Sequence, residues 1–374
     1  MSSRGKTVSE CMCVDKQKCL TRQLVGEVDD KKVYFYYLTN KSGMELCVSN
    51  YGATVVSLKY PDINGVPADI VLGFDTLDKY RNDTYFECNP FMGGVVGRFA
   101  NRIGGGVYTL DDIVYKLEKN NGQNCLHSGI RGFDKVVWDP MTSLIDTCES
   151  VVLTYISPDG EGGFGGTLTT TVIYSLTDNN EFRISYRATT DKPTVVNLTN
   201  HAYFNLSGEG SESVLDTVVM INADYFTPSD FLQIPTGEFM SVENTPFDFR
   251  KPITIGAGIN NIHDQLVLGN GYDHNWVLKK ERDGELSLAA TAHDPSSGRF
   301  MEVFTTEPGV QFYTGNNLKD ALVGKSGKPY IARSGFCFET QHFPDSPNKP
   351  QFPNTVLRPG ETFESSTIYK FSLR

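Results

Sequence analysis

Long apolar runs are missing from this sequence, and tryptophan is rare, with 2 residues in 374. No apolar stretch approaches the roughly 20 residues of a transmembrane helix. The N-terminal segment also lacks an apolar stretch like the core of a signal peptide. We therefore expect a cytoplasmic protein without a membrane anchor.

Positive charge is also scarce. The chain has 34 Lys and Arg against 45 Asp and Glu, which gives a formal net charge of -11. Nucleic-acid binders usually present a basic patch, and no run of Lys or Arg forms one here. An acidic surface has little attraction for anionic lipids. We expect neither a nucleic acid nor a membrane as partner.

Cysteine pairs with zinc-site spacing are missing. Most of the eight cysteines stand singly in apolar stretches, as at Cys47, Cys125 and Cys337, where they are typical of small buried hydrophobes. The sequence "CMCVDKQKC" spaces its cysteines at positions 11, 13 and 19, which matches no zinc pattern. HExxH, GxSxG and phosphate-loop motifs are also absent. We expect no metal and no cofactor.

Stretches long enough for helices are few, because 35 glycines and 18 prolines interrupt the chain. What the chain has instead is short runs rich in Val, Ile, Thr, Tyr and Phe, separated by turn residues. The even spacing predicts an all-β fold, either a sandwich or a barrel, with short helical turns only at 74–83 and 228–234. We expect a polar tail over 1–26 and a single domain over 27–374.

The stretch "GFCFETQHFPDSPN" at 335–348 reads as a strand with an unusual carboxylate at its centre. Alternation places Phe336 and Phe338 on one face and Glu339 on the other. If the second face lines a pocket, Glu339 is a partly desolvated carboxylate and a candidate general base; if it meets water, Glu339 is an ordinary surface residue.

The stretch "NLTNHAYFNL" has the same two-sided character. Asn197, Thr199, His201, Tyr203 and Asn205 share one face, and mostly apolar residues occupy the other. This pattern describes a solvated strand or the polar floor of a pocket, and the central His and Tyr favour the pocket.

Four shorter motifs add candidate polar groups. The glycine-rich "NPFMGGVVGRFANRIGGG" contains Asn101 and Arg102, and "LHSGIRGFDK" places His127 in a turn. Asp273 enters a strand in "NGYDHNWVL", and Gln311 lies in "GVQFYTGN". The other histidines, at 263, 274, 293 and 342, are expected at the surface. This inventory suits acid–base chemistry on a polyhydroxylated ligand.

Together these motifs resemble the aldose 1-epimerases, or galactose mutarotases, over nearly the whole chain after residue 27. The resemblance also includes "NYGATVVSL", "TPFDFRKPITIG" and "RPGETFESSTIYKFS". It implies a large antiparallel β-sandwich with an open sugar-binding cleft. It also implies interconversion of the α and β anomers of hexoses such as galactose and glucose, without a cofactor.

The resemblance assigns roles to individual residues. It implies that Glu339 is the general base, His201 the general acid and His127 a supporting histidine. It places sugar binding at Asn101, Arg102, Asp273 and Gln311. One loop departs from the family pattern, since Phe164 and Gly165 stand where Tyr and Pro are usual.

Three alternatives stay open at this point. A glycoside hydrolase could use Glu339 and Asp273 as paired carboxylates. A hexose-6-phosphate 1-epimerase would need clustered Arg or Lys for the phosphate, and only Arg102 lies in a site motif. A non-catalytic sugar-binding relative would keep the pocket without the chemistry. We expect a monomer, with a homodimer as the alternative.

Overall fold

The computed structural model describes residues 10–11, 19–145 and 148–374, and antiparallel sheets dominate it. A six-stranded sheet contains, in spatial order, β1 (Glu10–Cys11), β2 (Cys19–Val28), β3 (Lys31–Thr39), β4 (Glu45–Ser49), β5 (Val55–Pro61) and β6 (Pro67–Asp69). A nine-stranded sheet contains, in spatial order, β12 (Asp139–Ile145), β13 (Cys148–Ser157), β14 (Leu168–Leu176), β15 (Glu181–Thr190), β28 (Phe363–Leu373), β24 (Arg299–Thr305), β23 (Ser287–His293), β18 (Val218–Ile221) and β21 (Ile253–Thr254).

A third, five-stranded sheet contains, in spatial order, β20 (Met240–Ser241), β19 (Ala223–Thr227), β22 (Asp273–Leu278), β25 (Gly309–Tyr313) and β26 (Cys337–Gln341). Short strand pairs connect the large sheets: β7 (Val95–Val96) with β17 (Thr199–Asn200), β8 (Arg102–Ile103) with β11 (Cys125–Leu126), β9 (Val107–Leu110) with β10 (Ile113–Lys116), and β16 (Thr194–Val195) with β27 (Val356–Leu357). The α-helices are short: α1 (Asp83–Cys88), α2 (Ile255–Gly258) and α3 (Asp264–Gly269).

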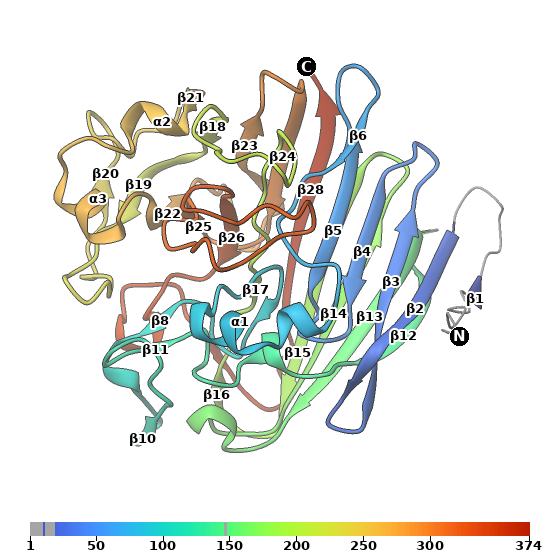
Figure 1. The fold of residues 1–374 in the computed structure, drawn as a ribbon. Helices are drawn as coiled ribbons and strands as arrows, with labels where there is room; N and C mark the ends of the chain where they lie inside the picture. The colour runs from blue at the N-terminus through green and yellow to red at the C-terminus, as the bar shows by residue number, and fades with distance from the viewer. Residues whose placement is uncertain (1–9, 12–18, 146–147) are drawn as a thin grey trace.

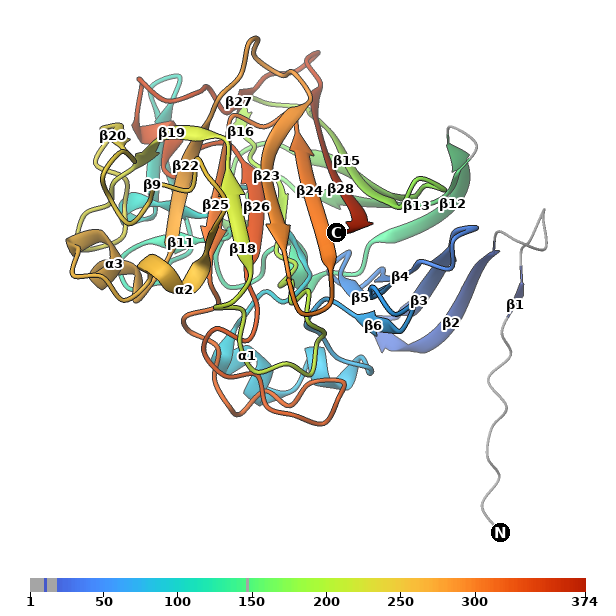
Figure 2. The same ribbon diagram turned by 90° about the horizontal axis from the view of Figure 1, so that it is seen from above.

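The sheets stack as layers. Figure 1 shows the six-stranded sheet on one side of the molecule and the five-stranded sheet on the other, and the nine-stranded sheet extends from β12 beside the first to β18 and β21 beside the second. Seen from above, strands β2–β6 face strands β12–β15 (Figure 2). Apolar side chains from all three sheets form one continuous buried core. This arrangement buries the apolar face of each sheet against a neighbour, as a sandwich must.

The all-β antiparallel sandwich predicted from the sequence is confirmed. The expected helical turn near residues 74–83 is present as a 3₁₀ turn at Asp78–Tyr80, followed by α1. Residues 228–234 form turns and bridges rather than a helix. The expected boundary at residue 26 falls inside β2, which begins at Cys19, because this strand pairs with β3 along its length. Glu10–Cys11 of the predicted tail forms β1, whereas residues 1–9 and 12–18, and with them the cysteine cluster at 11, 13 and 19 as a whole, lie outside the described residues.

Strand β26 has the two faces that alternation predicts. Phe336, just before the strand, and Phe338 lie in the apolar core, and the hydroxyl of Tyr369 on β28 donates to the Phe338 carbonyl at 3.0 Å. Every residue of β26 is nevertheless buried, including Glu339 on the opposite face. The second face is therefore covered by other segments of the chain, and Glu339 is removed from bulk water.

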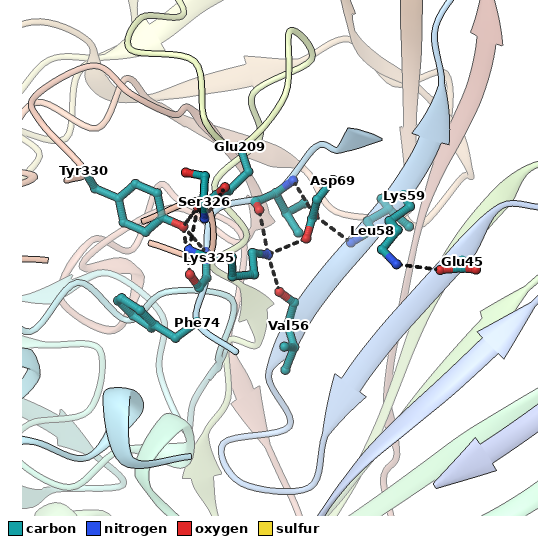
Figure 3. Close-up of polar contacts among 12 residues, drawn as sticks. Glu45, Val56, Leu58, Lys59, Asp69, Phe74, Glu209, Lys325, Ser326 and Tyr330 are labelled. Carbon is teal, nitrogen blue, oxygen red and sulfur yellow. Dashed lines mark hydrogen bonds and ion pairs between the residues drawn. The ribbon is translucent and has the colours of Figure 1, made fainter. Parts of the chain in front are cut away.

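The loop at 314–336, between β25 and β26, is tied to the six-stranded sheet by Lys325, which is partly buried. The Lys325 ammonium donates to the carbonyl oxygens of Val56 and Val71 at 2.6 and 3.0 Å and pairs with Asp69 at 2.7 Å (Figure 3). These three acceptors satisfy the three donors of the ammonium group. Lys325 thus fixes the loop against β5 and β6.

Glu209 holds the same loop from the opposite direction. Its carboxylate accepts hydrogen bonds from the backbone N–H groups of Lys325 and Ser326, at 2.8 and 3.1 Å, and from the hydroxyl of Tyr330. Glu209 and the Tyr330 hydroxyl are buried, and the two N–H groups are partly buried. The loop depends on this carboxylate for its conformation.

None of the helices in the described residues combines the length and the hydropathy that crossing a membrane requires.

Replacing Glu209 with Ala is expected to lower the free energy of unfolding by about 2 kcal/mol, because it removes the acceptor of two partly buried N–H groups and of the buried Tyr330 hydroxyl. Urea denaturation followed by fluorescence measures this change. Glu212→Ala, at an exposed position nearby, is the control and is expected to change stability by less than about 0.5 kcal/mol. Equal stability of the two variants would contradict the anchoring role.

Candidate active site

A polar cavity of about 300 Å³ opens beside β26. Six of the residues singled out in the sequence line it: Asn101, Arg102, His127, His201, Asp273 and Glu339. Aromatic side chains complete the walls, among them Phe91, Tyr203 and Tyr313. The size and the mixture of donors, acceptors and ring faces suit a small polyhydroxylated ligand.

The five-stranded sheet supplies the carboxylates. Gln311 on β25 lies directly opposite Glu339 on β26, and Asp273 begins β22, the strand on the other side of β25. The Gln311 amide donates to Asp273 Oδ1 at 2.7 Å. Gln311 does not line the cavity, so in this structure it orients Asp273 from behind.

Two short strands supply the next group. Arg102 begins β8 and His127 follows β11, and the two strands pair so that Leu126 lies opposite Arg102. Asn101 and His127 have left-handed backbones, with φ of 63° and 51°. The Asn101 N–H donates to His127 Nδ1 at 3.1 Å, and the His127 N–H donates to the Asn101 carbonyl at 3.0 Å. Because Nδ1 accepts a hydrogen bond, the neutral ring carries its proton on Nε2.

His201 follows β17 and faces Glu339 across the cavity. Its Nε2 lies 3.7 Å from Glu339 Oε1, and both side chains are about 95% buried or more. The other ring nitrogen, Nδ1, lies 3.5 Å from the Cys337 sulfur. Tyr203 packs near the ring, with centroids 5.0 Å apart. The imidazole therefore presents Nε2 to the carboxylate and is held on its remaining sides.

Burial controls the electrostatics of this pair. It lowers the pKa of His201 from 6.5 to about 4. Burial also raises the pKa of Glu339 well above its usual range, Asp273 raises it further, and Arg102 opposes the rise. For Asp273, burial raises the pKa, while Arg102 and the Gln311 hydrogen bond lower it. The neutral forms of His201 and Glu339 are thus favoured over the charged forms.

His127 is also neutral. Its pKa is lowered well below 6.5 by burial first, and then by His201, Arg102 and Lys135. With Nδ1 occupied by the Asn101 N–H, its Nε2–H is a donor available to a ligand oxygen.

The sequence revealed no grouping with metal-ligand spacing, whereas the fold brings one together. One nitrogen each of His127 and His201 and one carboxylate oxygen of Glu339 lie within 4.8 Å of one another. Their positions along the chain are too far apart for any local motif to show this. Because both imidazoles are neutral and the carboxyl is close to His201, the same three groups are equally suited to proton transfer.

Some neighbours in the sequence motifs do not reach the cavity. Asn197 bonds instead with the backbone of His342 and Ala100, and Asn205 donates to the carbonyls of Ser211 and Ser334. Both stabilise turns around the site, so the predicted polar face of 197–205 is only partly a pocket floor.

One histidine expected at the surface is buried. His274 is 3% exposed, because it follows Asp273 on β22 and packs against Phe247, with ring centroids 4.8 Å apart. Its Nδ1 accepts from the Asp273 backbone N–H at 3.1 Å. The surface prediction for His274 was wrong because strand alternation turns it into the core.

Sequence reasoning missed the two residues that hold Arg102. Asn121 and Gln233 accept hydrogen bonds from its guanidinium at 3.1 and 2.5 Å. Both lie in loops, where no periodicity reveals which way a side chain points. The aromatic residue Phe91, whose ring centroid lies 4.5 Å from that of His127, also had no local signal.

In the loop that departs from the family pattern, packing explains the glycine at position 165. A Cβ at Gly165 would lie 2.5 Å from the Tyr115 ring, so Pro would not fit there. Phe164 is buried in an apolar cluster with Tyr108. The Arg98 guanidinium donates to the Gly165 carbonyl at 3.0 Å, which holds the loop in place.

The family model for aldose 1-epimerase matches residues 34–370. Galactose mutarotase from Bos taurus is 47% identical over 326 residues, which cover 87% of this chain and 90% of that protein. Aldose 1-epimerase from Escherichia coli is 38% identical over 336 residues, which cover 89% of this chain and 94% of that protein.

Solved structures agree with these relatives. Galactose 1-epimerase from Lactobacillus acidophilus superposes with a TM-score of 0.81 at 29% identity, covering 95% of this chain and 98% of that one. The aldose epimerase homologue from C. elegans has a TM-score of 0.81 at 31% identity, covering 91% and 98%. Because these matches extend over most of its length, this chain belongs to the aldose 1-epimerase family.

Proposed function

We propose that this chain interconverts the α and β anomers of hexoses such as galactose and glucose, with Glu339 as general base and His201 as general acid. The observation that carries the assignment is the 3.7 Å approach of His201 Nε2 to Glu339 Oε1 inside the polar cavity. A carboxyl group and an imidazole at this separation can flank the O1–C1–O5 unit of a cyclic sugar.

Ring opening moves one proton at each end of that unit. The Glu339 carboxylate takes the proton of the anomeric hydroxyl, and the His201 imidazolium protonates the ring oxygen as the C1–O5 bond breaks. The open-chain aldehyde then rotates about C1–C2, and on ring closure Glu339 gives its proton to the carbonyl oxygen while His201 takes the proton back from the O5 hydroxyl. Nothing is consumed, and each proton transfer contributes ~10²–10⁴-fold to the rate.

The burial of the pair favours this sequence of states. Before ring opening the pair is a carboxylate and an imidazolium; after ring opening it is a carboxylic acid and a neutral imidazole. Both arrangements hold one proton between the two residues, so they differ only in charge separation. Because burial raises the pKa of Glu339 and lowers that of His201, it stabilises the arrangement that accompanies the open-chain sugar.

The remaining residues hold the sugar in this proposal. Asn101, Arg102 and Asp273 provide donors and acceptors for its hydroxyls, and Gln311 supports Asp273. His127 donates its Nε2–H to a sugar oxygen. The predicted domain over 27–374, extended to Cys19 by the start of β2, then acts as one catalytic domain, since site residues come from segments between Asn101 and Glu339. One chain supplies a complete site as a monomer.

The alternative activities have less support. Among the described residues that line the cavity, Arg102 is the one Lys or Arg, which is too little positive charge for a sugar phosphate. A hydrolase of the paired-carboxylate type would need Asp273 free to act, whereas the Gln311 amide occupies its Oδ1. We also propose a cytoplasmic location, since the thiols of five cysteines are free, at positions 47, 88, 125, 148 and 337.

Glu339→Gln and His201→Asn are each expected to lower kcat by ~10²–10⁴-fold in polarimetry of freshly dissolved α-D-galactose and α-D-glucose. Because the two residues exchange protons as a unit, the double variant should lose little more than either single variant. The control is Glu281→Gln, at an exposed position. Near-normal activity of either single variant would contradict its assigned role, and strictly additive losses would contradict the coupling.

The pH profile of kcat/KM is expected to be bell-shaped, and its two limbs should report the titration of the His201–Glu339 pair. As pH falls through the His201 pKa of about 4, the pair gains a second proton and no base remains. As pH rises through the raised pKa of Glu339, the pair loses its only proton and no acid remains. Ordinary pKa values would give the reverse assignment. Polarimetry across the stable pH range tests this, and a Glu339→Gln variant that keeps the alkaline limb would refute it.

Dialysis against EDTA is expected to leave the rate unchanged, because both reacting groups are side chains. Elemental analysis of the dialysed protein provides the control for complete metal removal. A loss of activity that added zinc or magnesium restores would contradict the cofactor-free mechanism.

A further inference from the structure

The guanidinium of Arg102 is held at the cavity by two neutral amides. Its Nε donates to Asn121 Oδ1 at 3.1 Å, and its Nη2 donates to Gln233 Oε1 at 2.5 Å. Arg102 is 7% exposed, so water contributes little to its solvation. A buried arginine is more commonly matched by a carboxylate, whose planar pair of oxygens fits the guanidinium fork. Here both of these partners lack charge.

Gln233 is itself firmly placed. Its side-chain amide donates to the carbonyl of Leu268 in α3 at 2.8 Å. Its backbone has a left-handed φ of 61°, and its N–H donates to the Asp230 carbonyl at 2.9 Å, closing a tight turn. The neighbouring Leu232 carbonyl accepts from the Asn124 amide at 3.0 Å, which docks this turn onto the segment after β10. The Gln233 side chain therefore reaches Arg102 in one defined orientation.

Gln233 does not line the cavity, so it acts on the site through Arg102. Asn121 lines the cavity as well as holding the guanidinium, so it could also touch the ligand. A substitution at Gln233 therefore changes Arg102 without changing direct contacts to the sugar, which a substitution at Asn121 would not guarantee.

We propose that Gln233 is a positioning residue which, with Asn121, holds Arg102 through neutral amides so that its positive charge stays available to Asp273 and Glu339. This inference rests on the proposed function. A carboxylate at position 233 would keep the hydrogen bond but would form an ion pair, and the charge that reaches the two catalytic-site carboxyls would fall. An amide positions the guanidinium without neutralising its positive charge.

The charges around Glu339 determine the direction in which a negative charge at position 233 would shift the pKa values of the site. Arg102 lowers the pKa of both Glu339 and Asp273, so an added negative charge at position 233 would raise both. The titratable and charged groups that face Glu339 from the surrounding elements are Arg102 on β8, His127 after β11, His201 and Tyr203 after β17, Asp273 on β22, Tyr313 on β25, Cys337 on β26 and Tyr369 on β28. Among these, Arg102 is the group that Gln233 contacts.

Gln233→Glu and Gln233→Met separate charge from position. Gln233→Glu should shift the alkaline limb of the kcat/KM profile, which belongs to Glu339, to higher pH by about one unit and leave the acid limb of His201 in place. Gln233→Met removes the acceptor but adds no charge, so it should raise KM without moving the limbs. Gln123→Glu, an exposed charge addition two residues from Asn121, is the matched control and should keep the wild-type profile.

Each outcome is decisive for one of the two proposals. A Gln233→Glu profile with an unmoved alkaline limb, in an active enzyme, would overturn the role of the neutral amide while leaving the mutarotase assignment intact. Absence of anomer interconversion in the unmodified chain would overturn the proposed function instead. If Gln233→Glu fails to fold, Asn121→Asp adds the same charge on the other side of the guanidinium and should produce the same upward shift; unmoved limbs there would overturn the inference.

Discussion

Removal of water from the His201–Glu339 pair is the constraint on which the rest of this structure depends. A carboxyl group and an imidazole 3.7 Å apart in water would form an ordinary ion pair of little strength. In a buried cavity their single shared proton shifts from the charged arrangement towards the neutral one. In the proposed mechanism the same two groups open the ring and close it again, and burial favours the arrangement that accompanies the open-chain sugar.

The sandwich supplies that burial through a strand with two unlike faces. Phe338 and its neighbours anchor β26 to the nine-stranded sheet, and the Tyr369 hydroxyl fixes its backbone at 3.0 Å. The opposite face can then carry Glu339 without loss of the strand, since the apolar contacts on the first face outweigh the cost of one buried carboxyl. The loop held by Lys325 and Glu209 covers part of this second face.

Loops from the middle of the chain complete the site through backbone hydrogen bonds. The reciprocal bonds between Asn101 and His127, at 3.1 and 3.0 Å, hold two left-handed residues together and fix one imidazole tautomer. Arg102 is oriented by amides from two further loops. The polar groups of the cavity are thus positioned before any ligand arrives, and this pre-organisation lowers the ordering cost of binding.

The sequence by itself determined the strand-rich fold and the face on which Glu339 lies, because a period of two residues is a local property of the chain. Its motifs also indicated six of the polar groups that meet in the cavity. Tertiary structure alone decided that Gln311 supports Asp273 from behind, that Gln233 reaches Arg102 across 131 positions, and that His274 is buried. It also decided the direction of the pKa shifts of His201 and Glu339. These properties depend on burial and on contacts between distant segments, which local periodicity does not encode.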